Sequence, residues 1–133
     1  MDTNALVEGG VEGLRHIVQA LEKEGIDIRG AYLIKTTSVE GFARTSFRIV
    51  TDVDPRKVLY KFVQLRHDGR IPQLADEVPV SPMRPDHTEA ARVLDYAARI
   101  GSATVVISGV YWEGLFIEDA VVVKWPSPAH AAA

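Results

Sequence analysis

The chain has 133 residues, a net charge of −3 and no cysteine. This is the size of one ordinary domain, which buries enough apolar surface to fold without cross-links. The missing cysteines exclude disulfides, thiolate catalysis and cysteine-ligated metal centres. No apolar run approaches the length of a membrane span, so we expect a soluble cytoplasmic protein that does not contact membranes. We predict one domain over residues 1–125 and a disordered tail over 126–133.

The charge is unevenly distributed along the chain. Residues 43–70 hold seven bases and three acids, a charge of +4, which leaves −7 on the remainder. Such an excess can mark an anion-binding face, although solvated surface charges produce the same pattern. The negative total argues against nucleic acid as a partner, because phosphate attraction dominates that kind of binding.

Apolar residues at three- and four-residue spacing predict a first helix from about Val11 to Glu24, ended by Gly25. The glycine-rich stretch 9–13 precedes this helix. It follows no strand, and we interpret it as a flexible start rather than a phosphate-binding loop.

A first β-hairpin is predicted over Arg29–Val39 and Phe42–Val53, with Glu40-Gly41 as a two-residue turn. That turn pairs Ile34 with Phe47 and directs both toward the core. The opposite face then gathers polar side chains: Lys35, Thr37, Arg44, Ser46 and Arg48. A shift of one residue in the register would exchange the two faces.

A second helix is predicted to start at Asp54-Pro55 and to end at Gly69. Four prolines then prevent a helix and a central strand, at positions 72, 79, 82 and 85. We expect an extended segment there, with Glu77 to Val80 as a short edge strand. A third helix follows to Ile100.

The start of that third helix carries a capping-box spacing, Asp86 and Glu89, and Gly101 follows its end. A second hairpin is predicted over residues 103–125, again with a Glu-Gly turn, Glu113-Gly114. Because both hairpins have the same Glu-Gly turn and each follows a helix, an internal duplication of an αββ unit is one possible interpretation. Both strands of this hairpin are apolar on both faces, so each face needs a cover. A helix on each side or a second copy of the chain would provide it, and we favour a homodimer through residues 103–125.

The predicted fold is α+β in the order α-ββ-α-(extended)-α-ββ. It contains a mainly antiparallel sheet of four or five strands, with three helices predominantly on one face.

The basic face of the first hairpin is the leading candidate site. Lys35, Arg44 and Arg48 would lie together there and would suit carboxylate or phosphate groups. The alternative is a solvated sheet face, or arginines paired with acids from elsewhere.

Three other residues are candidates for acid–base catalysis. His67 stands beside Asp68, although a cation near a helix end also complements the helix dipole. Glu118 and Asp119 interrupt an apolar strand, and a half-buried carboxylate there would have a raised pKa. They could equally mark a β-bulge or guard a strand edge.

No spacing of histidines and acids favours a metal site, although Asp86, His87 and Glu89 stand close together. No cofactor motif occurs, and we expect no cofactor.

The leading functional hypothesis is a non-enzymatic homodimeric binding module for a small anionic ligand or a protein partner. The first alternative is a small enzyme that acts on an anionic metabolite, with Arg44 and Arg48 as the clamp. A weaker alternative is a winged-helix-like DNA binder that uses the helix 89–100 and the last hairpin.

Overall fold

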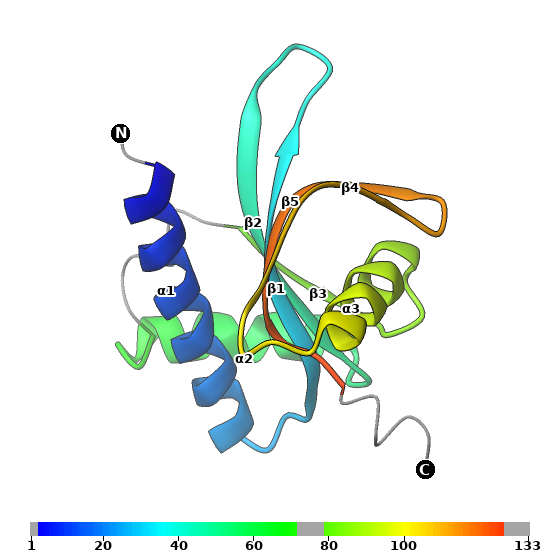
Figure 1. Ribbon diagram of the computed structural model, residues 1–133. Coiled ribbons are helices and arrows are strands. Elements are labelled where there is room, and N and C mark those ends of the chain that lie inside the picture. Colours follow the sequence, from blue (N-terminus) through cyan, green and yellow to red (C-terminus); the bar gives the residue numbers. More distant parts are fainter. Residues whose placement is uncertain (1–2, 72–78, 127–133) are drawn as a thin grey trace.

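The computed structural model describes residues 3–71 and 79–126 (Figure 1). The helices and strands are α1 (Thr3–Lys23), β1 (Ile28–Thr37), β2 (Ala43–Thr51), α2 (Pro55–His67), β3 (Val80–Met83), α3 (Thr88–Ile100), β4 (Val105–Trp112) and β5 (Leu115–Lys124). This confirms the predicted α+β order. No helix in the described ranges is long and apolar enough to cross a membrane. Of the predicted tail, residues 127–133 lie outside the described residues, as do residues 77 and 78 of the predicted edge strand.

The five strands form one mixed sheet in the order β3-β2-β1-β5-β4. The hairpins β1–β2 and β4–β5 are antiparallel, and β1 pairs with β5 antiparallel to join them. Only β3 is parallel to its neighbour, because α2 carries the chain back across the sheet before β3 begins. β3 is an edge strand, and an edge tolerates Pro82, which has no N–H to donate.

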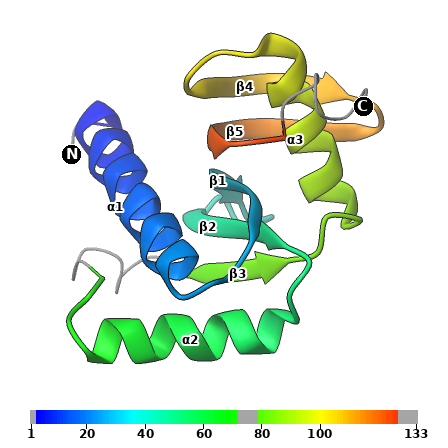
Figure 2. The same cartoon turned by 90° about the horizontal axis from the view of Figure 1, so that it is seen from below.

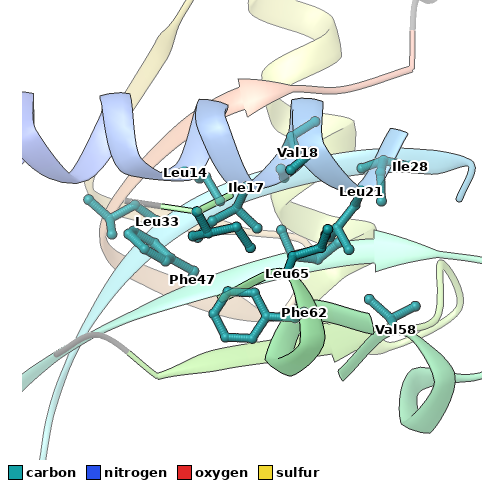
Figure 3. Packing of buried hydrophobic residues seen from close by; sticks show 14 of the residues in the cluster. Leu14, Ile17, Val18, Leu21, Ile28, Leu33, Phe47, Val58, Phe62 and Leu65 are labelled. Atoms are coloured by element: carbon teal, nitrogen blue, oxygen red, sulfur yellow. The ribbon is translucent and has the colours of Figure 1, made fainter. Parts of the chain in front are cut away.

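Helices cover both faces of the sheet. Figure 2 shows α1 and α2 on one side and α3 on the other. The prediction of helices predominantly on one face was therefore incomplete, since α3 supplies the second cover. Each face has its own core cluster. On the α1/α2 side, Leu14, Ile17 and Leu21 from α1 meet Phe62 and Leu65 from α2 over the sheet (Figure 3).

α1 is longer than predicted, because it begins at Thr3 rather than near Val11. The glycine-rich stretch 9–13 is part of the helix and not a flexible start. Gly10 lies against β1, where an added Cβ would come within 3.3 Å of a Leu33 methyl group. The small residue thus lets the helix approach the sheet closely.

The start of α2 is confirmed, but the start of α3 differs from the prediction. Asp54 caps α2 by accepting a hydrogen bond from the backbone N–H of Arg56. The capping box at α3 does not form, since His87 is the N-cap residue and makes no side-chain cap. Glu89 instead points toward the sheet, where it accepts hydrogen bonds from Tyr32 and Arg48.

The register of the first hairpin is shifted by one residue from the predicted one. Leu33 lies opposite Phe47, and Tyr32 lies opposite Arg48. The turn is not Glu40-Gly41 alone but the five residues 38–42, in which the Ser38 hydroxyl accepts from the Phe42 N–H. This shift exchanges the two faces of β2 relative to those of β1. Tyr32 and Arg48 therefore lie on the same face, the one that α3 covers.

The Glu113-Gly114 turn of the second hairpin is confirmed, with φ of 42° and 90° at the two turn residues. The predicted faces of this hairpin are wrong, because the alternation of sides breaks at one place in both strands. Val105 and Ile107 face α3, but so do Val110 and Trp112. The break lies at Gly109, whose φ is 62°. Beyond it the hairpin curls over α3, as Figure 1 shows.

Candidate functional site

A polar cluster is enclosed between the sheet and the first turn of α3. The Tyr32 hydroxyl donates to Glu89 Oε1 at 2.6 Å, and Arg48 Nε donates to the same oxygen at 3.1 Å. Tyr32 is fully buried, and the Arg48 and Glu89 side chains are only 17% and 20% exposed. Tyr32 and Arg48 are cross-strand partners, so adjacent strands present both groups to the same carboxylate.

The electrostatics of this cluster favour structure over catalysis. Burial, followed by the neighbouring charge of Glu89, raises the pKa of Tyr32 far above its usual range. A tyrosine that keeps its proton is a poor base and a poor nucleophile. The carboxylate of Glu89 is satisfied by two donors and lies in the first turn of a helix, where a negative charge is favourable. The cluster therefore attaches α3 to the sheet.

The three cations of the predicted basic face do not come together. Arg48 is held in the ion pair with Glu89, and Arg44 lies exposed near the tip of the first hairpin. Lys35 is paired with Thr45, whereas Arg44 is paired with Thr36, and successive residues of a strand face opposite ways. The corrected register thus puts Lys35 on the face opposite Arg44 and Arg48.

Of the three candidate acid–base residues, His67 lies apart on α2, and Glu118 and Asp119 are neighbours in β5 that contact different partners. His67 is on the last turn of α2, with its side chain 89% exposed and its Nδ1 3.7 Å from an Asp68 carboxylate oxygen. Glu118 accepts a hydrogen bond from the Thr37 hydroxyl at 2.9 Å, and Asp119 accepts one from the Ser108 hydroxyl at 2.7 Å. Asp119 lies opposite Ser108, as predicted.

No group of histidines and acids that could hold a metal ion occurs within the described ranges. The segment Asp86-His87 lies at the start of α3, in a wide depression of about 830 Å³ that Arg48, Arg84 and Glu89 also line. Arg48 is paired with Glu89, Arg84 donates to the backbone carbonyl of Asp52, and Asp86 lines the same depression, so this depression has no strong charge preference.

Another concave surface lies between the two hairpins on the side of α3, and we call it the inter-hairpin angle. Figure 1 shows the first hairpin projecting away from the body and the second curling over α3. Two depressions of about 660 and 200 Å³ share Thr36 and Thr37 as lining residues. Phe42 and Arg44 line the larger depression, and Phe116 and Glu118 line the smaller one.

Two exposed aromatic side chains, Phe42 and Phe116, line the inter-hairpin angle. Phe42 is 74% exposed, Phe116 is 60% exposed, and Tyr111 is paired with Phe116 across the second hairpin at 71% exposure. A hydrogen bond from Thr37 to Glu118 joins the two hairpins at the base of the angle. Sequence reasoning missed this surface, because it assigned Phe42 to a strand and did not foresee the break at Gly109.

The arrangement of α3 does not suit the reading of DNA bases. Arg92 donates from Nε to the backbone carbonyl of Glu113 at 2.8 Å, and Arg99 lies over the Trp112 ring at 5.2 Å. Both arginines of the predicted recognition helix thus bind the second hairpin. The predicted wing folds onto the helix instead of extending beside it.

No protein-family model, no curated protein and no solved structure matches this chain. The functional argument therefore rests on the geometry of the described residues.

Proposed function

We propose that the protein is a non-enzymatic binding module that takes an extended segment of a protein partner in the inter-hairpin angle. The observation that carries this proposal is that two exposed aromatic side chains, Phe42 and Phe116, line two adjoining depressions, with exposed Tyr111 paired with Phe116 on the neighbouring strand. Aromatic side chains are enriched at protein interfaces because they bury a large area with few rotatable bonds.

A protein segment fits this surface better than a small anion does. Arg44 lines the larger depression, Lys35 lines the smaller one beside Glu118, and Arg48 is paired with Glu89, so a small anion would not meet the three cations together. A segment with an apolar or aromatic anchor would contact Phe116, and an acidic residue beside the anchor would reach Arg44. The hydroxyl groups of Thr36 and Thr37 donate to the Arg44 carbonyl and to Glu118, and their oxygens can accept hydrogen bonds from the segment between these two points.

The enzyme hypothesis has less support. One of His67, Glu118 or Asp119 would have to converge with both Arg44 and Arg48 on one pocket. Arg48 is paired with Glu89 and lines a different depression from Arg44, so the two arginines do not form a clamp. Tyr32, whose pKa is raised far above its usual range by burial, is enclosed and stays protonated. A non-catalytic role accounts for the same residues with fewer requirements.

Selection of random peptides on the immobilised full chain tests the proposal. We expect selected peptides to combine an aromatic or large apolar residue with a nearby acid. Phe116→Ser and Arg44→Glu should each weaken their binding at least about tenfold, the effect of losing one interface hot spot. Tyr60→Ser is the matched control, since Tyr60 is an equally exposed aromatic residue on α2.

The proposal is wrong if Tyr60→Ser weakens the selected peptides while Phe116→Ser does not. It is also wrong if no peptide is enriched over a blank surface. Chemical-shift mapping with a selected peptide gives an independent check, because the shifts should concentrate on residues 34–44 and 111–118.

A further inference from the structure

The two edges of the sheet are unlike. β3 forms one edge and β4 forms the other. β3 has four residues and includes Pro82, which prevents regular pairing with a further strand. β4 has eight residues, Val105–Trp112, and contains neither a proline nor a charged residue. Natural sheets protect exposed edges with such residues, so β4 lacks the usual protection.

The straight part of β4 is the segment Val105–Ser108, before the break at Gly109. Val105 and Ile107 are buried against the α3 side, and the side chain between them, Val106, is 70% exposed. An exposed valine on an uncharged edge favours contact with another strand.

We infer that this edge pairs with β4 of a second copy of the chain, in an antiparallel arrangement about a two-fold axis beside Val106. In an antiparallel pairing about a two-fold axis, the residue at the axis meets its own counterpart and the flanking residues pair reciprocally, i with j and j with i, so a charge at the axis would face a like charge. β4 has no charge to repel its copy, which makes it self-complementary. The pairing closes after two copies, because the other edge, β3, is guarded by its proline.

The sequence led us to expect a homodimer through the second hairpin, and this pairing assigns the contact to one strand of it, β4. The pairing does not depend on what the inter-hairpin angle binds. The break at Gly109 ends the straight segment, so the paired region is short. The interface is therefore expected to be small, and the dimer to dissociate in the micromolar range.

Light scattering after size exclusion tests the inference on the full chain. At roughly 0.5 mM, well above micromolar dissociation constants, the chain should elute with twice its mass of 14.6 kDa. Val106→Lys should raise the dimer dissociation constant at least about tenfold, since two lysines would then meet at the axis. Tyr60→Lys is the control, because it adds the same charge to an equally exposed site on α2.

The absence of cysteine allows a second, direct readout. A single Val106→Cys substitution should yield a disulfide-linked dimer on mild oxidation, whereas Tyr60→Cys should yield little. A monomer at the high concentration overturns the inference. A dimer that is insensitive to Val106→Lys and not linked through residue 106 overturns it too, as does an assembly larger than two copies.

The dimer and the peptide site fail independently. Phe116→Ser should weaken peptide binding and leave the dimer intact, and Val106→Lys should weaken the dimer and leave peptide binding unchanged. Far-UV circular dichroism of each variant shows whether the fold is retained, which we expect because both side chains are exposed.

Discussion

The clearest single-residue effect in this protein is the enclosure of Tyr32. Its hydroxyl donates to Glu89 from a fully buried position, and Arg48 neutralises the same carboxylate. Each group is satisfied only because the other two are present, so the three residues act as one unit. The sequence contained all three residues, but it gave no sign that they would meet, since they lie on two strands and a helix.

Tyr32→Phe provides a test with a defined pH dependence. Because the pKa of Tyr32 is raised in the folded state, the stability from its protonated hydroxyl is present below about pH 10 and is lost as the pH rises further. At pH 11 Tyr32 is ionised in the unfolded chain and protonated in the folded one, which lowers the unfolding free energy of the unsubstituted protein by about 1.4 kcal/mol. Tyr32→Phe has no ionisable group there and does not show this decrease. Urea unfolding of both proteins at pH 7, 9 and 11 measures this difference. A gap between the two that stays constant up to pH 11 contradicts the assignment.

At the scale of whole elements, the break at Gly109 determines where the second hairpin goes. The break lets the distal half of the hairpin curl over α3, where Trp112 packs edge-on against Tyr96 with ring centroids 5.4 Å apart. It also turns Phe116 into the inter-hairpin angle. A regular hairpin would have placed these aromatic side chains elsewhere, so this one backbone position shapes the candidate site.

Two glycine-to-alanine substitutions should change stability in opposite directions. Gly109→Ala should lower the unfolding free energy by about 1–2 kcal/mol, because an alanine at positive φ is strained. Gly13→Ala should raise it by roughly 0.5–1 kcal/mol, because alanine favours the helix. The added methyl group there meets only Phe47 at an ordinary 3.8 Å. Urea unfolding gives both values, and an equal effect of the two substitutions would refute the role of Gly109.

At the scale of the molecule, one sheet separates two cores and belongs to both. Val121 faces the α1/α2 side while Val122 faces the α3 side, and the other central strands alternate in the same way. Neither layer of helices has another surface to pack on. We therefore expect the domain to unfold as a single cooperative unit.

Leu21→Ala tests this expectation, because Leu21 is fully buried on the α1/α2 side. Removing its side chain should lower the unfolding free energy by about 2–5 kcal/mol. Trp112 and Trp125 both pack on the α3 side, so tryptophan fluorescence reports on the other core. Its unfolding midpoint should fall together with that of far-UV circular dichroism. If fluorescence keeps the original midpoint while circular dichroism shifts, the two layers unfold separately.

Local patterns in the sequence determined the order of the elements. These patterns act between residues close in the chain, so they can be interpreted without knowledge of the fold. They are the apolar spacing of the helices, Asp54-Pro55 before α2, Gly101 after α3 and the Glu113-Gly114 turn. The same locality explains the errors. The longer turn of the first hairpin shifts the strand register by one residue, and the alternation of the second hairpin breaks at the single residue Gly109. A shift of one residue is enough to exchange the faces of a strand.

Only the tertiary structure decided which residues of distant elements meet. Three features depend on contacts between segments far apart in sequence: β3 pairs parallel to β2, α3 packs on the second face of the sheet, and Tyr32, Arg48 and Glu89 form one cluster. No short-range pattern encodes such contacts, because burial and pairing energies are set by the whole packing arrangement. The first hairpin therefore lost its predicted basic face and acquired, with the second, an aromatic-rimmed angle.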